Sequence, residues 1–343
     1  MKSVKIGGKR IGKGEPTFII AEIGYNFENV EQAKQSIEAA VEAGADAVKF
    51  QTFKADTIVT RDIMFPPEAG GTSQYEEFKR FEMSEEMHRE VFGYARQRGI
   101  IAFSTPSHPD DVELLERIGV PAYKIGSDDL TNVPFLQYVA RKGRPMIVST
   151  GMGTLAEVEN AIETIRGEGN EHIVMLQCVS SYPITDLSTV NLRAIQTIER
   201  AFDVPVGLSD HTTTISIPIA AVALGAVAVE RHFTLSKDLS VPDAFFSADT
   251  GELKTIVRGI REVEMALGDG IKRPTHAETE MRRETRKGLI AACDIPAGTR
   301  LTEEMIIIKR PGTGIAPKCL DLIVGRTARV DIKVDTVITW DMI

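Results

Sequence analysis

Short apolar runs alternate with longer segments of helical periodicity between residues 17 and 270. The runs are rich in β-branched residues, as buried strands are, whereas segments such as VEQAKQSIEAAVEAG carry apolar residues at helical spacing. Eight strands are predicted: TFIIAE, DAVKFQ, IIAFST, PAYKIG, PMIVST, IVMLQC, VPVGLS and AVAVERH. Eight strand–helix units in about 250 residues predict a (β/α)8 TIM barrel. A doubly wound sheet is the alternative, but it usually has fewer units and a glycine-rich first turn, which AEIGYN lacks.

One connection is much longer than the others. The stretch KADTIVTRDIMFPPEAGGTSQYEEFKRFE follows the second predicted strand and contains Pro66-Pro67 and Gly70-Gly71. Connections of this length are uncommon and are usually functional or disordered. In a barrel it is expected to lie over the C-terminal face.

The pattern changes after Gly270. The polar segment IKRPTHAETEMRRETRKG is typical of a linker, and the tail beyond it contains a weak internal repeat. Residues 294–306 and 331–343 share six of thirteen positions, each copy having the form strand, turn, strand, short helical cap. These features predict a barrel domain at 1–270, a linker at 271–284 and a small, mostly β domain at 285–343.

Composition limits the classes of partner and the cellular compartment that we expect. The net charge is −9, from 40 Lys and Arg against 49 Asp and Glu, which argues against nucleic acid or an anionic membrane as the main partner. Three scattered cysteines form neither a disulfide framework nor a CxxC site. We see no signal peptide and no apolar run of about 18 residues, so we expect a cytoplasmic protein that does not span a membrane.

Polar residues stand at the same end of every predicted strand, and in a barrel this end forms the active-site mouth. They are Glu22; Lys49 and Gln51; Ser104 and Thr105; Lys124 and Ser127; Ser149 and Thr150; Ser180 and Tyr182; Ser209, Asp210 and His211; and Glu230 and His232. Polar strand termini that merely face water would explain some of the hydroxyls. Exposure of the strand ends to water does not readily explain why two lysines stand inside the apolar runs AVKFQ and AYKIG.

The two strand lysines, Lys49 and Lys124, favour an anion site, because a buried ammonium is costly unless an anion meets it. The nearby hydroxyls would complete a cradle for a phosphate or carboxylate. His211 and His232 end adjacent strands and are candidates to share one divalent cation, with a hydrogen-bonded core pair as the alternative. Cys178 is a candidate nucleophile, but no partner is placed to activate it, and packing is the simpler interpretation.

At these residues the sequence resembles a known family. IIAEIGYN, AGADAVKFQTFKAD, FSTP, GVPAYKIGSDDLTNVPFL, VSTGM, GLSDHT, ERHFTL and KRPGTG together resemble the sialic acid (nonulosonate) synthases, in order and along nearly the whole chain. The resemblance implies a TIM barrel followed by an antifreeze-like SAF domain. It also implies condensation of phosphoenolpyruvate with an N-acyl hexosamine to a nine-carbon 2-keto acid and phosphate.

The resemblance further implies residue roles. Lys49, Thr105, Lys124, Ser127, Ser149 and Ser209 match the phosphoenolpyruvate cradle, and Ser180 stands where the family usually has an Asn. His211 and His232 match ligands of Mn²⁺ or Mg²⁺, while Glu22, Gln51, Tyr182 and Asp243 match groups that meet the sugar. Arg310 matches an arginine that reaches the partner's barrel in a domain-swapped homodimer. Lys49 would hold the substrate through catalysis, and Glu22 and Asp243 are both candidates for moving protons.

Three departures concern the sugar. Phe27 replaces a usual His, Ser180 replaces the Asn, and Ala244 replaces the His of a common GPDH motif. They imply that the chemistry is kept and the sugar specificity is open among sialic, legionaminic and pseudaminic branches. Two alternatives remain: a synthase that uses another aldose to make a 3-deoxy sugar acid, and a non-catalytic sugar-binding relative.

Overall fold

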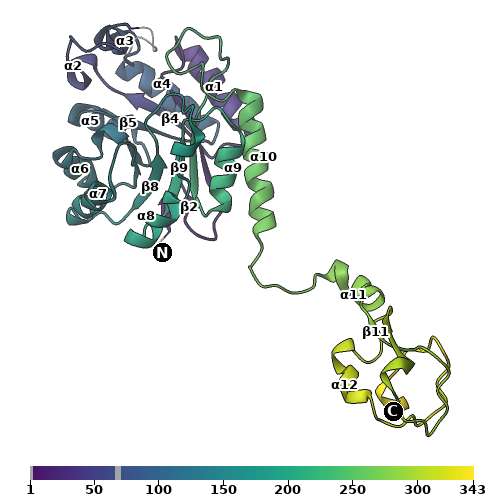
Figure 1. Cartoon of the computed structure of the whole chain (residues 1–343). Helices are drawn as coiled ribbons and strands as arrows, with labels where there is room; N and C mark the ends of the chain where they lie inside the picture. Colours follow the sequence, from purple (N-terminus) through teal and green to yellow (C-terminus); the bar gives the residue numbers. More distant parts are fainter. Residues whose placement is uncertain (1–2, 66–70) are drawn as a thin grey trace. The chain divides into compact units, whose positions relative to one another are not determined.

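Eight parallel strands close into a barrel in the computed structural model, which describes residues 3–65 and 71–343 (Figure 1). They are β3 (Phe18–Gly24), β4 (Ala47–Thr52), β5 (Ile101–Pro106), β6 (Tyr123–Ile125), β7 (Met146–Ser149), β8 (Ile173–Cys178), β9 (Val206–Asp210) and β10 (Ala228–His232). Each pairs with the next along the chain, and β10 pairs with β3 to complete the ring. The predicted TIM barrel is confirmed, with every strand within two residues of its predicted run.

Helices surround the barrel. They are α1 (Val30–Ala43), α4 (Glu85–Gln97), α5 (Pro109–Ile118), α6 (Val133–Ala140), α7 (Leu155–Gly167), α8 (Ala194–Phe202), α9 (Ser216–Ala223) and α10 (Thr250–Leu267). Local sequence fixes their ends: the side chain of Asn29 accepts the backbone N–H of Gln32 at the start of α1. At its end Gly44 adopts a left-handed φ of 85°, where a side chain would be strained.

Alternation along each strand divides the side chains between the barrel interior and the helical layer. On β4, Phe50 points outward, because its ring lies 5.4 Å from that of Phe92 on α4. Lys49 and Gln51 therefore point into the barrel. This alternation places the polar residues at the C-terminal strand ends around one interior space.

The long connection after β4 contains two short helices, α2 (Ala55–Ile58) and α3 (Gln74–Arg80). Its Phe53 and Phe81 form a buried cluster with Val241 and Ala244 of the loop between β10 and α10. The connection therefore lies against C-terminal loops of the barrel, as expected. Pro66, Pro67 and Gly70 lie outside the described residues.

An N-terminal hairpin was not predicted. It pairs β1 (Val4–Ile6) with β2 (Lys9–Ile11), and Val4, Ile6 and Ile11 are buried. A Cβ at Gly7 would stand 2.6 Å from Cγ1 of Ile101, at the N-terminal end of β5. The hairpin thus packs against the end of the barrel opposite the predicted mouth. Its signal in the sequence is the Gly7-Gly8 turn between two alternating runs.

The tail forms a second compact unit, Asp269–Ile343, separate from Met1–Gly268. It contains α11 (Thr279–Thr285), β11 (Gly288–Ala291), β12 (Ile306–Lys309) and α12 (Leu320–Ile323), and β11 pairs antiparallel with β12. Its own core includes Leu289, Leu301, Ile323 and Ile338. The predicted small, mostly β tail domain is confirmed.

The internal repeat corresponds to a structural repeat within this unit. The equivalent residues Ile295 and Ile332 exchange two backbone hydrogen bonds of 2.8 Å. Asp294 accepts the N–H of Val334, and Asp331 accepts the N–H of Ala297 in the equivalent contact. The two copies therefore face each other about a local pseudo-twofold axis, which explains why the repeat persists.

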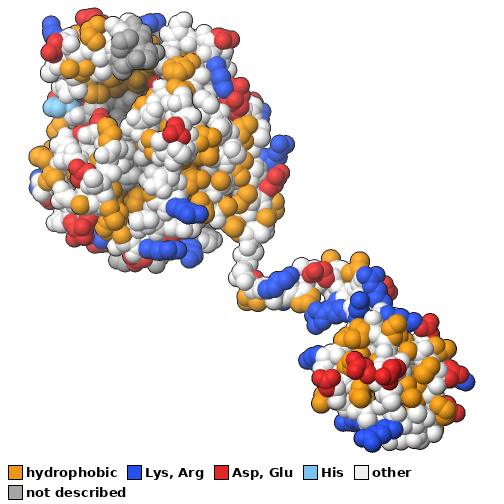
Figure 2. Space-filling view, in the orientation of Figure 1, with side chains coloured by type: hydrophobic (Ala, Val, Ile, Leu, Met, Phe, Trp, Pro, Cys, Tyr) orange, Lys and Arg blue, Asp and Glu red, His pale blue; other side chains and the backbone are white. Residues whose placement is uncertain are grey.

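Cationic side chains gather along the segment that precedes β11 (Figure 2). Lys272, Arg273, Arg282, Arg283 and Arg286 are all exposed there.

None of the helices in residues 3–65 and 71–343 is both long enough and apolar enough to cross a membrane.

A buried polar chain ties α4 to the outer face of the barrel. His88 Nδ1 lies 2.8 Å from the carbonyl of Ser84, and Nε2 lies 2.9 Å from Oγ1 of Thr52. Thr52 Oγ1 in turn lies 2.7 Å from Oγ of Ser104. Burial lowers the pKa of His88 below its usual 6.5. The imidazole is therefore held neutral in the folded protein.

We expect this histidine to make the barrel less stable in acid. Below about pH 6.5 this histidine binds a proton in the unfolded chain but stays neutral in the folded protein. The free energy of unfolding therefore falls as the pH drops, until the pH reaches the pKa of folded His88. The contribution is up to about 1.4 kcal/mol per pH unit. Urea unfolding between about pH 7.5 and about pH 5 should show a steeper loss in wild type than in H88Q. Equal slopes would contradict the assignment.

Candidate active site

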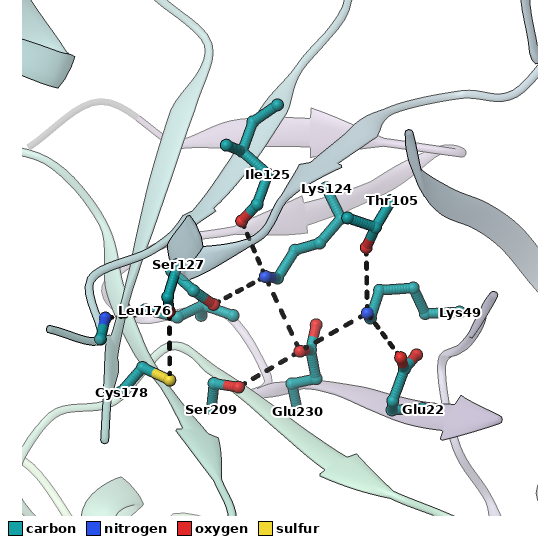
Figure 3. A network of polar contacts seen from close by, with 12 residues as sticks. Glu22, Lys49, Thr105, Lys124, Ile125, Ser127, Leu176, Cys178, Ser209 and Glu230 are labelled. Atoms are coloured by element: carbon teal, nitrogen blue, oxygen red, sulfur yellow. Dashed lines mark hydrogen bonds and ion pairs between the residues drawn. The ribbon is translucent and has the colours of Figure 1, made fainter. Parts of the chain in front are cut away.

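Thirteen predicted barrel residues lie at the C-terminal ends of the strands or in the loops that follow them, as expected. Seven are joined through Glu230 in one connected set around the barrel interior: Glu22, Gln51, Lys49, Thr105, Lys124, Ser149 and Ser209. Ser127 and His211 each contact Cys178 at the end of β8, and Ser180 lies near Ser127 beside Gly151. The contacts that join them are described below, and Figure 3 shows the central part of the set. Tyr182, His232 and Asp243 adjoin His211 on one side.

Lys49 lies in a fully enclosed position on β4. Its ammonium is 2.8 Å from Oε1 of Glu22 and donates to Oγ1 of Thr105 at 3.1 Å. Gln51 Nε2 donates to the same Glu22 oxygen at 3.0 Å. The charge of Lys49 is thus already balanced by the carboxylate of Glu22. The pattern of the sequence predicts only an external anion as the partner of this lysine.

Lys124 occupies the matching position on β6. Its ammonium donates to Oγ of Ser149 at 2.6 Å and to the backbone carbonyl of Ile125 at 2.9 Å. Glu230 reaches it from β10, with Oε1 at 3.8 Å from Nζ, and the same oxygen lies 3.8 Å from Nζ of Lys49. The two lysines therefore face one carboxylate across the barrel.

Burial and the neighbouring charges shift the pKa values of the two lysines and of Glu230. Burial works to lower the pKa of Lys49, but Glu22 and Glu230 outweigh it and raise that pKa above 10.5. For Lys124 burial dominates and lowers the pKa. Burial alone would raise the pKa of Glu230, but the positive charges of Lys124 and Lys49 outweigh it and lower that pKa below 4.5. The carboxylate of Glu230 is thus ionised at neutral pH.

Several polar atoms of this cluster are incompletely bonded. Among the described residues, Oε2 of Glu22, Oε2 of Glu230 and Oγ of Ser180 are buried and have no hydrogen-bond partner. Buried polar atoms in native proteins are nearly always bonded, so such atoms call for a functional or solvent explanation. They make this cluster a candidate site at which a polar ligand or solvent supplies the remaining hydrogen bonds.

Two serine hydroxyls converge beside Gly151, which lies two residues after Ser149. The N–H of Gly151 donates to Oγ of Ser127 at 3.0 Å. A Cβ on Gly151 would stand 2.2 Å from Oγ of Ser180 and 2.7 Å from Oγ of Ser127. Glycine is therefore required for the two serines to converge. Ser180, one of the departures expected on the sugar side, thus lies beside Ser127 of the predicted cradle.

His211 and His232 lie side by side, with ring centroids 5.2 Å apart. Nδ1 of His211 faces the carbonyl of Val179 at 2.9 Å, so it carries the proton and leaves Nε2 with a lone pair. Burial, and then the neighbouring His232, lowers the pKa of His211 to about 3. The imidazole is neutral at physiological pH, which is the form that binds metals.

The sugar-side residues surround this pair. The ring of Tyr182 lies 4.2 Å from that of His211, and its side chain is half exposed. Oδ2 of Asp243 lies 3.4 Å from Nδ1 of His232, and the backbone N–H of Asp243 donates to Oδ1 of Asn26 at 3.2 Å. Asn26, which the sequence interpretation did not single out, thus positions the loop that carries Asp243.

Phe27 and Ala244 do not line this space. Phe27 is buried in the main core, and its ring lies 6.1 Å from outward-pointing Phe50. Ala244 is fully enclosed in the apolar cluster with Phe53 and Phe81. Phe27 therefore does not reach the predicted sugar side, and Ala244 supports the loop that carries Asp243 through its apolar packing.

Glu230 is the main residue that the sequence interpretation underrated. It does not pair with its neighbour Arg231, which instead donates to Asp210 at 2.8 Å on the outer face of the barrel. The available signal was the alternation along β10, which places Glu230 and His232 on the same face. Cys178 lies 3.9 Å from Nδ1 of His211, but burial raises its thiol pKa, so it remains an unactivated thiol.

Arg310 stands in the second unit, directly after β12, and is exposed. Its predicted role depends on a second subunit and is taken up below.

Comparison with known proteins supplies the remaining evidence. The NeuB family profile matches residues 36–272, and the SAF domain profile matches residues 286–343. The N,N'-diacetyllegionaminic acid synthase of Legionella pneumophila is 41% identical over 99% of this chain and 98% of its own length. Human N-acetylneuraminate-9-phosphate synthase is 37% identical over 98% of this chain and 95% of its own.

A solved structure agrees with these relatives. The N-acetylneuraminic acid synthetase of Leptospira borgpetersenii, crystallised with citrate, superimposes with a TM-score of 0.75 at 31% identity. The match covers 82% of this chain and 95% of that one. The resemblance seen in the sequence is thereby confirmed over barrel and tail.

Proposed function

The chain belongs to the NeuB family, and from that premise we propose that it condenses phosphoenolpyruvate with an N-acyl hexosamine, giving a nine-carbon 2-keto acid and phosphate. The observation that carries the proposal is the interior cluster of two lysines and two carboxylates beside two imidazoles. Such a site can hold a highly charged donor and leave an adjacent space for an aldehyde.

Lys49 and Lys124 would hold the anionic groups of phosphoenolpyruvate by charge-assisted hydrogen bonds. Thr105 and Ser149 already contact the two ammoniums and fix their direction. Ser127, Ser180 and Ser209 would supply further hydroxyl donors. Because these groups are set by barrel strands, they would need little reorganisation during the reaction.

The two histidines fit a divalent cation such as Mn²⁺ or Mg²⁺. Nδ1 of His232 is buried and makes no hydrogen bond within the described residues, although Oδ2 of Asp243 lies 3.4 Å from it, and His211 presents a free Nε2. No cluster of three or more His, Cys, Asp or Glu arranged for a metal occurs in residues 3–65 and 71–343, so two imidazoles would leave positions open for water and substrate. When bound, such a cation would polarise the aldehyde oxygen of the sugar.

The reaction would then proceed by two additions. The methylene carbon of phosphoenolpyruvate forms a bond to the aldehyde carbon, whose oxygen takes up a proton. Water adds to the resulting cationic carbon and gives up one proton, which leaves a hydroxyl on that carbon. The hydroxyl becomes the keto C=O as the bond from the carbon to the phosphate oxygen breaks, and its proton leaves with the phosphate. Glu22, with its unbonded Oε2 in the cradle, would accept the proton of the water, and Asp243, beside His232, would serve the sugar oxygen.

We also propose that Arg310 completes the site of a second subunit in a domain-swapped homodimer. Large apolar side chains on the loops at the barrel mouth support this, because they are exposed in the single chain: Met152, Tyr182, Leu187 and Phe245. Exposed apolar groups around a polar site are typical of a surface that another chain covers.

Subunit complementation tests the swapped arrangement. We expect K124M and R310A each to be inactive, and a one-to-one mixture after unfolding and refolding to recover about a quarter of wild-type turnover. A mixed dimer would combine the intact barrel of one subunit with the intact Arg310 of the other. Deletion of residues 285–343 should likewise abolish turnover and leave a folded barrel. No recovery in mixtures that do contain mixed dimers would contradict the arrangement.

Phosphate release tests the activity itself. The protein would be assayed with phosphoenolpyruvate and Mn²⁺ against N-acyl mannosamine-type sugars, altrosamine-type sugars and an unsubstituted aldose phosphate. We expect release with at least one N-acyl sugar. Release only with the unsubstituted aldose would favour the 3-deoxy sugar acid synthase, and no release from folded, metal-loaded protein would favour a binding protein.

A further inference from the structure

Glu230 joins the two lysines of the cradle through a single oxygen atom. Its Oε1 lies 3.8 Å from each ammonium and accepts a hydrogen bond of 3.2 Å from Oγ of Ser209 (Figure 3). The side chain comes from β10, across the interior from β4 and β6. It therefore occupies the space between the two cations.

These ionic contacts are loose compared with the others in the cluster. Lys49 lies closer to Glu22, at 2.8 Å, and Lys124 lies closer to Ser149, at 2.6 Å. In the described part of the chain, the second oxygen of Glu230 is buried and lacks a hydrogen-bond partner. Glu230 is thus held mainly by charge, and a stronger anion could take over its contacts without breaking a full set of hydrogen bonds.

The charges of the cluster also cancel. Two ammoniums face two carboxylates, so the cradle presents no net positive charge from these four groups. An arriving phosphate must therefore compete with a carboxylate that is already present. This balance is unexpected for a site whose only task is to bind a phosphate tightly.

We propose that Glu230 is a positioning residue that stands in for the phosphate group when the cradle is empty. It keeps the two lysines charged and correctly spaced, and it limits the affinity for phosphate so that this product can leave. The inference rests on the proposed function for the identity of the anion. A purely structural glutamate would have the opposite effect on binding when replaced, because its loss would loosen the cradle.

Calorimetric titration of inorganic phosphate tests the inference on the full chain, with and without Mn²⁺. E230Q keeps the shape of the side chain and removes its charge. We expect phosphate to bind at least about tenfold more tightly to E230Q than to wild type, since a unit charge at this range is worth more than a factor of ten. In turnover, KM for phosphoenolpyruvate and kcat should both fall, because phosphate leaves more slowly.

E113Q is the matched control. Glu113 contacts Lys142 in the outer helical layer, so this variant has the same net charge as E230Q and leaves the cradle unchanged. Phosphate affinity should equal that of wild type. Equal tightening in both variants would show a general charge effect and overturn the inference.

Other outcomes are also decisive. Unchanged or weaker phosphate binding by E230Q overturns the role of Glu230 but leaves the proposed synthase activity standing. No phosphate binding by either wild type or E230Q overturns the anion cradle and the inference together. If E230Q does not fold, E230D replaces it: the shorter carboxylate withdraws from both lysines, and binding should still tighten, by about twofold or more.

Discussion

K124M is expected to release phosphate from phosphoenolpyruvate about 1,000-fold more slowly than wild type, with most of the loss in kcat. Lys124 is enclosed in the barrel, and its ammonium donates to Ser149 and to the carbonyl of Ile125. Methionine has a similar length but no charge, so it can neither hold the donor nor stabilise charge that develops during the reaction. Steady-state kinetics with a sugar that wild type accepts provide the measurement.

K142M is the control for this result. Lys142 contacts Glu113 on the outer layer, so its replacement removes the same charge away from the barrel interior. Its turnover should stay within about twofold of wild type, as expected for a partly exposed ion pair outside the barrel interior. Near-normal turnover of folded K124M would contradict the cradle.

H232A should lose Mn²⁺ affinity by at least about 100-fold, together with nearly all turnover. With only two imidazoles available, removal of one leaves His211 as the single nitrogen ligand. Manganese binding followed by electron paramagnetic resonance measures this without reference to activity. The comparison is H172A, because His172 is exposed and precedes β8 at the far end of the barrel.

The outcome with H172A decides between a metal site and a packed histidine pair. Wild-type Mn²⁺ affinity in H172A and loss in H232A would support the site. Equal affinity in all three proteins would favour the alternative interpretation, in which His211 and His232 are a core histidine pair without a metal.

Much of the barrel could be predicted because its signals are local. Each strand is a short apolar run, and the C-terminal end of every strand must face the same mouth. This topological rule brought Lys49 and Lys124 together although they are far apart in sequence. The hairpin at the N-terminus was missed because its strands are only three residues long.

The partners of the site residues were harder to foresee, because they depend on register and on side-chain reach. Alternation places Glu230 in the barrel, but only the closed ring shows that one of its oxygens meets both lysines. Phe27 illustrates a second limit. The pairing of β3 with β4 shifts register between Glu22 and Gly24, so alternation cannot be extended to the loop that follows.

Isotope tracing tests the central claim most directly. Wild-type protein with Mn²⁺, phosphoenolpyruvate and an accepted N-acyl sugar would be incubated in water enriched in ¹⁸O, and the products analysed by mass spectrometry. The account predicts one nine-carbon 2-keto acid per phosphate, and phosphate without ¹⁸O, because water attacks carbon and the carbon–oxygen bond breaks. Sugar-independent release, or phosphate that carries ¹⁸O from attack at phosphorus, would contradict it.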